Sequence, residues 1–132
     1  MSVTSPAPLS GVLDTVASDP KLVGFLTHVG ESRLHVQGPD AAWPFAVATL
    51  ARKAPVLVVT ATGRQAEDLT AELTAMLGDV VALMPSWETL PHERLSPGVE
   101  TVSQRRAALY RLAHGEVKVL VAPARSVVQP VM

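Results

Sequence analysis

The chain of 132 residues is long enough for one domain with a single hydrophobic core. Its 48% hydrophobic and 17% charged residues exclude a disordered segment, and its interrupted apolar runs exclude a membrane span. A formal net charge of −1 gives no overall attraction to nucleic acid or an acidic membrane. The lack of cysteine excludes disulfides and thiolate metal ligands, and it fits a cytoplasmic protein.

The first third of the chain predicts helices around one short strand. Residues 9–17 have the apolar spacing of a short helix, whereas residues 21–29 are ambiguous between a second helix and extended chain. The alternating run at 33–36 predicts the first strand. Residues 42–53 predict a helix that tolerates Pro44 in its first turn. The apolar stripe of the first helix consists of Leu9, Val12, Leu13 and Val16.

The middle of the chain contains the clearest strand and the clearest helix. Residues 55–60 form a continuous β-branched run without polar alternation, so we expect a central strand covered on both faces. Thr62 and Gln65 have the spacing of a capping box at the start of a helix that ends at Gly78. The predicted buried stripe of this helix consists of Ala66, Leu69, Leu73, Met76 and Leu77, and its solvated side of Glu67, Asp68 and Glu72.

The last part of the chain repeats the same alternation. Residues 79–84 predict a third strand, residues 85–98 a long loop with three prolines, and residues 99–114 a helix stopped by Gly115. Residues 117–122 predict a fourth strand, and a further helix begins after it. The predicted buried stripe of the helix over 99–114 consists of Val99, Val102, Leu109, Leu112 and Ala113.

This order of elements predicts an α/β fold. Strands that alternate with helices imply right-handed crossovers and a parallel sheet with helices on both faces. Residues 1–30 are expected to form an N-terminal helical segment, and residues 31–132 an α/β domain truncated at its C-terminal end. Val127, Val128 and Val131 near that end are apolar, so self-association of a fragment through them is a further hypothesis.

A phosphate-loop position follows the first predicted strand, but its residues do not suit phosphate. The pattern G-x-x-x-x-G-K-[ST] begins at Gly38, and its second glycine, lysine and hydroxyl positions hold Trp43, Pro44 and Phe45. Pro44 lacks the backbone N–H that would help to cradle a phosphate, and the two aromatic residues add apolar bulk. The sequence therefore predicts a helicase-like or P-loop-like scaffold with a degenerate nucleotide site.

The loop at 85–98 mixes an aromatic residue with several charges, and loops of this length are commonly functional. One interpretation is a contact surface for a protein partner or nucleic acid; the other is that the loop packs on its own domain while its charges pair. His92 and Glu93 lack the spacing of a zinc motif, so no metal site is expected. The candidate interaction residues of this loop are Trp87, Glu88, His92 and Arg94.

Two further candidate interaction residues, Arg105 and Arg106, lie on the next predicted helix. Adjacent residues diverge around a helix, so only one of the two can line up with neighbouring turns. An alternative hypothesis is a nucleotide or nucleic-acid binding site made from Trp87, His92, Arg94 and Arg105. No serine has a nucleophile-elbow setting, so the sequence gives no catalytic residue.

The string MPSWETLP at 84–91, followed by Glu93 and Ser96-Pro97, resembles the N-terminal region of the bacterial transcription-repair coupling factors. Arg106 and the string VLVAPARS at 119–126 match the same region. The resemblance implies that this domain is similar to the first domain of the excision-repair subunit UvrB, a helicase-like α/β fold, here without its nucleotide site.

The resemblance also implies a function in DNA repair. The complete protein would be an ATP-driven DNA translocase, a hydrolase that displaces stalled RNA polymerase from double-stranded DNA and recruits UvrA for nucleotide excision repair. ATP and magnesium would bind only to a downstream motor, so this fragment is expected to be non-catalytic and without a cofactor. Its expected role is a scaffold that contacts other domains of the same chain; the alternative is a nucleic-acid or nucleotide binding domain of a UvrB-like repair enzyme.

Overall fold

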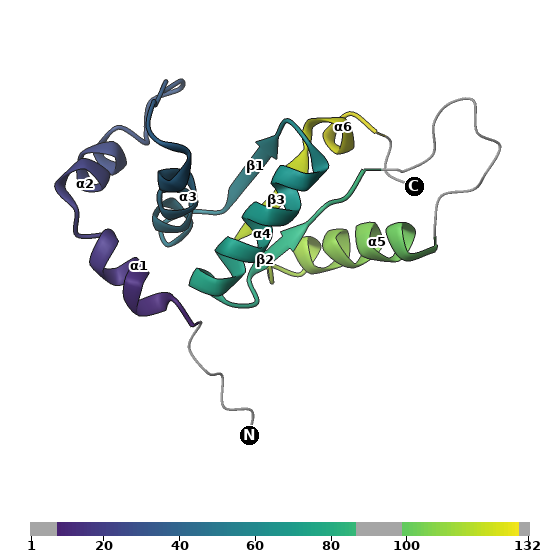
Figure 1. Ribbon diagram of the computed structural model, residues 1–132. Helices are drawn as coiled ribbons and strands as arrows, with labels where there is room; N and C mark the ends of the chain where they lie inside the picture. The colour runs from purple at the N-terminus through teal and green to yellow at the C-terminus, as the bar shows by residue number, and fades with distance from the viewer. Residues whose placement is uncertain (1–7, 87–98, 130–132) are drawn as a thin grey trace.

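The computed structural model describes residues 8–86 and 99–129 (Figure 1). The helices α1 and α2 lie at the opposite end of the molecule from α5. Within the described residues, no helix combines the length and apolarity that crossing a membrane would require. The elements are α1 (Ser10–Val16), α2 (Pro20–Thr27), the 3-10 helix η1 (Asp40–Ala42), α3 (Trp43–Ala51), β1 (Val56–Thr60), α4 (Gly63–Leu77), β2 (Val81–Leu83), α5 (Val99–Ala113), β3 (Val119–Pro123) and α6 (Ala124–Val127).

The three strands form a parallel sheet in the order β1-β3-β2, which confirms the predicted α/β class and parallel sheet. The register pairs Val56 with Val119 at the start of β1 and Thr60 with Pro123 at its end. The prediction that residues 55–60 form the central strand was wrong, because β3 lies between β1 and β2. The sequence of β1 is apolar on both faces of the sheet, as in a central strand. One long edge of β1 nevertheless has no partner strand among the described residues.

The predicted first strand at 33–36 was also wrong. Residues 33–39 have no regular secondary structure, and the chain then enters η1. A strand is stable only where its backbone groups pair with a neighbour. The alternating side chains of this segment are compatible with a strand, but no described strand pairs with it.

The two faces of the sheet are covered by different helices. On one face, α1, α3 and α4 contribute Leu13, Ala48 and Leu73 to a core cluster with Val119 and Val121 of β3. On the other face, Ala108 of α5 packs in a second cluster; its strand and loop residues are Ala82, Met84, Val117 and Ala122. Alternate residues of a strand point to opposite faces, so the odd-numbered positions of β3 serve the first cluster and Ala122 the second. Helices therefore lie on both faces, as predicted.

The predicted start and end of α4 are confirmed. The Thr62 hydroxyl accepts a hydrogen bond from the Gln65 backbone N–H, and the Gln65 side chain accepts one from the Thr62 backbone N–H, each at 3.2 Å. This capping box satisfies two amides that the helix itself leaves free. Gly78 ends the helix with φ of 84°, a left-handed conformation that favours glycine.

The stripe of α5 that faces the sheet differs from the prediction. Val99 is 82% exposed and Leu112 is 43% exposed, while Thr101, Arg105 and Ala108 are buried. The helix is therefore rotated relative to the most apolar face of its sequence. On the buried side of the helix, the Arg105 side chain donates a hydrogen bond to the Pro85 backbone carbonyl, a contact that the apolar spacing of the helix does not indicate.

Candidate functional site

The segment at 38–45, for which the sequence predicts a degenerate phosphate loop, lies where the chain enters α3. The Ala42 backbone N–H donates to the Pro39 carbonyl at 2.9 Å, and the Trp43 backbone N–H donates to the Asp40 carbonyl, so η1 uses two amides that a phosphate would need. Pro44 stands in the first turn of α3 and has no N–H. The amides available to an anion at this helix start are correspondingly few.

The backbone of the loop also differs from an anion-binding nest. A nest combines right-handed and left-handed residues so that successive N–H groups converge. Within the described residues, positive φ occurs only at Gly78 and Gly115, so Gly38 does not supply the left-handed residue. The exposed Asp40 carboxylate in the first turn adds a negative charge beside the position that a phosphate would take.

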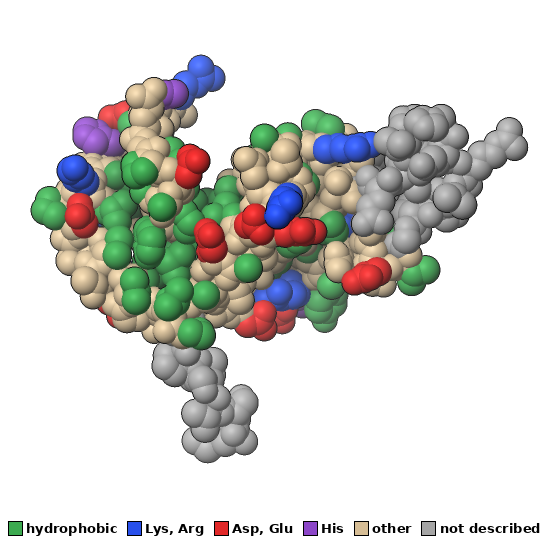
Figure 2. Space-filling view, in the orientation of Figure 1, with side chains coloured by type: hydrophobic (Ala, Val, Ile, Leu, Met, Phe, Trp, Pro, Cys, Tyr) green, Lys and Arg blue, Asp and Glu red, His purple; other side chains and the backbone are tan. Residues whose placement is uncertain are grey.

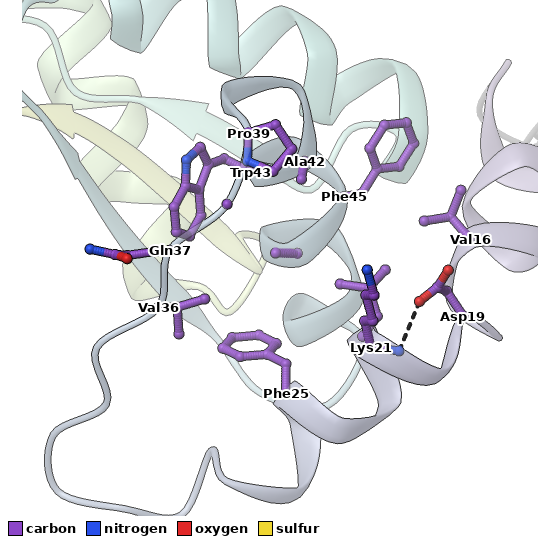
Figure 3. Close-up of a pocket in the computed structure, with 13 residues that line it drawn as sticks. Val16, Asp19, Lys21, Phe25, Val36, Gln37, Pro39, Ala42, Trp43 and Phe45 are labelled. Atoms are coloured by element: carbon purple, nitrogen blue, oxygen red, sulfur yellow. Dashed lines mark hydrogen bonds between the residues drawn. The ribbon is translucent and has the colours of Figure 1, made fainter.

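Trp43 and Phe45 line an open groove between α3, α2 and the extended segment before η1 (Figure 3). Trp43, Val36 and Phe25 lie along one side of the groove and Phe45 on the other. The groove has a volume of about 400 Å³, and Trp43 is 37% exposed within it. The two aromatic residues therefore form apolar walls here, and only Phe45 also packs against the main core cluster.

Arg105 is buried between α5, α6 and the end of the segment that follows β2. Its Nη1 donates to the Pro85 carbonyl oxygen at 2.6 Å and to Ser126 Oγ at 3.0 Å, and the Ser126 hydroxyl donates to the same carbonyl at 3.2 Å. Only 3% of Arg105 is exposed, and this burial lowers the pKa of its guanidinium. Its place is therefore inside the fold. Sequence reasoning missed Ser126, which is separated from Pro85 by 41 positions.

The other candidate interaction residues have different surroundings. Arg106 is exposed, and among the described residues it makes no ion pair or side-chain hydrogen bond. Trp87, Glu88, His92 and Arg94 lie outside the described residues. Within the residues that the structure describes, no group of three or more His, Asp or Glu side chains could hold a metal ion.

The open edge of β1 is a feature that sequence reasoning did not identify. Leu57 is 56% exposed and Val59 is 51% exposed, since α5 covers the same face of the sheet only beside β2 and β3. The Val56 N–H donates to the Lys118 carbonyl at 2.8 Å, so in the alternating pattern of a parallel ladder the N–H groups of Leu57 and Val59 point to the free edge. In β1, an exposed apolar face thus meets an edge that pairs with none of the described strands.

No family model matches this chain. It is 46% identical over 135 residues to the transcription-repair-coupling factor of Mycobacterium tuberculosis, an alignment that covers 96% of this chain and 11% of that protein. It is 31% identical over 104 residues to the transcription-repair-coupling factor of Escherichia coli, covering 77% of this chain and 9% of that protein. The chain thus spans about a tenth of the length of these relatives. It belongs, as a segment of that length, to the transcription-repair-coupling factor family.

Proposed function

We propose that this chain is a non-catalytic scaffold domain of a transcription-repair-coupling factor. The full-length protein is then an ATP-dependent DNA translocase that displaces stalled RNA polymerase and recruits UvrA for nucleotide excision repair. The observation that carries the proposal is the start of α3, where η1 uses the amides, Pro44 lacks one and Asp40 adds negative charge. A domain with this geometry contributes surfaces, and nucleotide chemistry is left to other parts of the protein.

The first test is a calorimetric titration of this chain with ATP and magnesium. We expect no heat of binding, because the loop at 38–45 offers neither a converging set of amides nor a lysine. The full-length protein serves as the control and is expected to bind ATP through its motor. Saturable binding to residues 1–132 with a micromolar dissociation constant would contradict a non-catalytic role for this domain.

The scaffold part of the proposal is supported by the open edge of β1. Exposed edge strands with apolar side chains are uncommon in proteins that work alone, because they pair with other chains. About nine-tenths of a full-length relative lies outside the aligned segment, so the proposed cover for Leu57 and Val59 is another part of the same polypeptide. Arg105, a candidate for the alternative nucleic-acid site, is buried and bonded inside the fold, which favours the scaffold over that alternative.

Hydrogen exchange provides the second test. In the full-length protein we expect the amides of Leu57 and Val59 to exchange roughly a hundredfold more slowly than in residues 1–132 alone, because a covering segment would accept their hydrogen bonds. The amides of Val58 and Val121, which lie inside the sheet, are the control and should be protected in both proteins. Equal exchange at Leu57 and Val59 in the two proteins would show that nothing covers this edge.

A further inference from the structure

A second groove, which Phe45 also lines, lies between the start of α1, the start of α3 and the last turns of α4. Its volume is about 660 Å³. Leu9, Pro44 and Phe45 supply apolar surface to it, and the buried Met76 lies beneath them. The Leu9 backbone N–H donates to the Ala75 carbonyl at 2.8 Å, so α1 and α4 are fixed to each other at the groove. The groove is therefore a formed feature of the helical layer.

Acidic side chains stand at the rim of this groove. Asp40 of η1 and Glu72 of α4 both line it, and both are exposed. The ion pairs of the described residues involve other carboxylates, those of Asp14, Glu31 and Asp79. Figure 2 shows apolar side chains in the hollow between the α1–α2 part of the chain and α4, with acidic side chains along its α4 side. One surface thus combines an apolar floor with two rim carboxylates that form no ion pair within the described part of the chain.

The same helix carries a further acidic residue one turn earlier. Asp68 and Glu72 are four positions apart, so they are neighbours on the surface of α4, and like charges at this spacing repel each other. Arg64 lies four positions before Asp68, but no ion pair joins them. A cation placed over Asp68 and Glu72 would relieve this repulsion.

We propose that this acid-rimmed groove docks an amphipathic helix from the remainder of the full-length protein, in which an apolar stripe is flanked by Lys or Arg. The apolar side chains of that helix would contact Leu9, Pro44 and Phe45, and its basic residues would pair with Asp40 and Glu72. The argument for a segment of the same protein is that about nine-tenths of a relative lies outside the aligned part. This inference rests on the proposed scaffold function and concerns a surface separate from the edge of β1.

Photo-cross-linking in the full-length protein tests the proposal. Ala71 lines the groove and is exposed, so its replacement by p-benzoylphenylalanine places a reactive group there without disturbing the core. We expect a cross-link to a peptide outside residues 1–132 that carries apolar residues flanked by Lys or Arg. The same replacement at Arg64, which is exposed at the start of α4 and lines none of the described grooves, is the control and should not give this product.

Charge reversal shows whether the rim contributes. Asp40→Lys combined with Glu72→Lys should lower the yield of the cross-link roughly fivefold, as expected for two exposed ion pairs. Glu67→Lys, a matched reversal on the same helix but away from the groove, should leave the yield unchanged.

If the photoreactive variant folds poorly, a cysteine introduced as Glu72→Cys should react with maleimide more slowly than one introduced as Glu67→Cys.

Several outcomes would overturn the proposal. They are a cross-link only to residues 1–7, only to a second copy in a mixture of isotopically light and heavy protein, or only to a separate protein. The absence of any product, together with equal maleimide reactivity at positions 67 and 72, would also overturn it. If the amides of Leu57 and Val59 exchange slowly in the full-length protein but one of these results is found, the scaffold function is supported. The proposal that the groove binds a helix of the same protein is then rejected.

Discussion

Replacing Arg105 by alanine is expected to lower the free energy of unfolding of this chain by about 3 kcal/mol, from lost charge-assisted hydrogen bonds and the cavity left behind. The guanidinium joins α5, the Pro85 carbonyl and Ser126 of α6, so the substitution removes a contact between three parts of the chain. The Pro85 carbonyl accepts hydrogen bonds from both Arg105 and Ser126, and the substitution leaves it only the bond from the Ser126 hydroxyl. Urea unfolding followed by circular dichroism measures the loss.

Arg106 provides a matched control for this prediction. It is the adjacent residue of the same helix, it carries the same charge, and it is exposed. Arg106→Ala should change the free energy of unfolding by less than about 0.5 kcal/mol. Arg105→Met separates packing from polar contacts, because methionine restores apolar volume without donors. Equal stability of Arg105→Ala and Arg106→Ala would mean that the buried contact contributes nothing.

The parts of the fold that the sequence predicted are those fixed by local chemistry. The capping box at Thr62 and Gln65 and the stop at Gly78 depend on residues within one helical turn, and the structure has all of them. The strands that become β1, β2 and β3 are continuous apolar runs, and their type was predicted although their ends shift by one or two residues. Local signals therefore gave the α/β class and the parallel sheet.

The errors concern pairing, which local signals do not contain. Residues 33–36 have the alternation of a strand, but a strand also requires a partner, and the sequence pattern does not say which strands become neighbours. The same reason explains why residues 55–60 were predicted to be central and are at an edge. Arg105 was predicted to be an interaction residue; its burial depends on contacts with Pro85 and Ser126, which are far away in sequence.

The candidate site was predictable in part. The degenerate phosphate loop stays a prediction, and its basis, Trp43, Pro44 and Phe45 at the glycine, lysine and hydroxyl positions of the pattern, lies in the sequence alone. The groove that Trp43 forms with Phe25 of α2 could not be predicted, because α2 and α3 are packed together only in the folded chain. The acidic rim could not be predicted for the same reason, because Asp40 of η1 and Glu72 of α4 come together only in the folded chain.

Leu73→Ala is expected to have the largest effect on the helical layer. Leu73 is fully buried on α4, where it packs in the cluster that also contains Leu13 of α1 and Val119 and Val121 of β3. Truncating a leucine in such a place removes its transfer free energy and leaves a cavity that the neighbours only partly fill, a loss of about 3 to 4 kcal/mol. Since small domains are marginally stable, this loss should leave much of the chain unfolded at room temperature.

Leu57→Ala is the control that makes the Leu73 result informative. Both substitutions delete the same atoms, but Leu57 is 56% exposed on the open face of β1, so its loss in the isolated chain should stay below about 1 kcal/mol. In the full-length protein the same Leu57→Ala change should become more costly, because the proposed cover would bury the side chain. If Leu57→Ala and Leu73→Ala shift the urea midpoint of residues 1–132 equally, the assignment of the core to the α4 side of β1 is wrong.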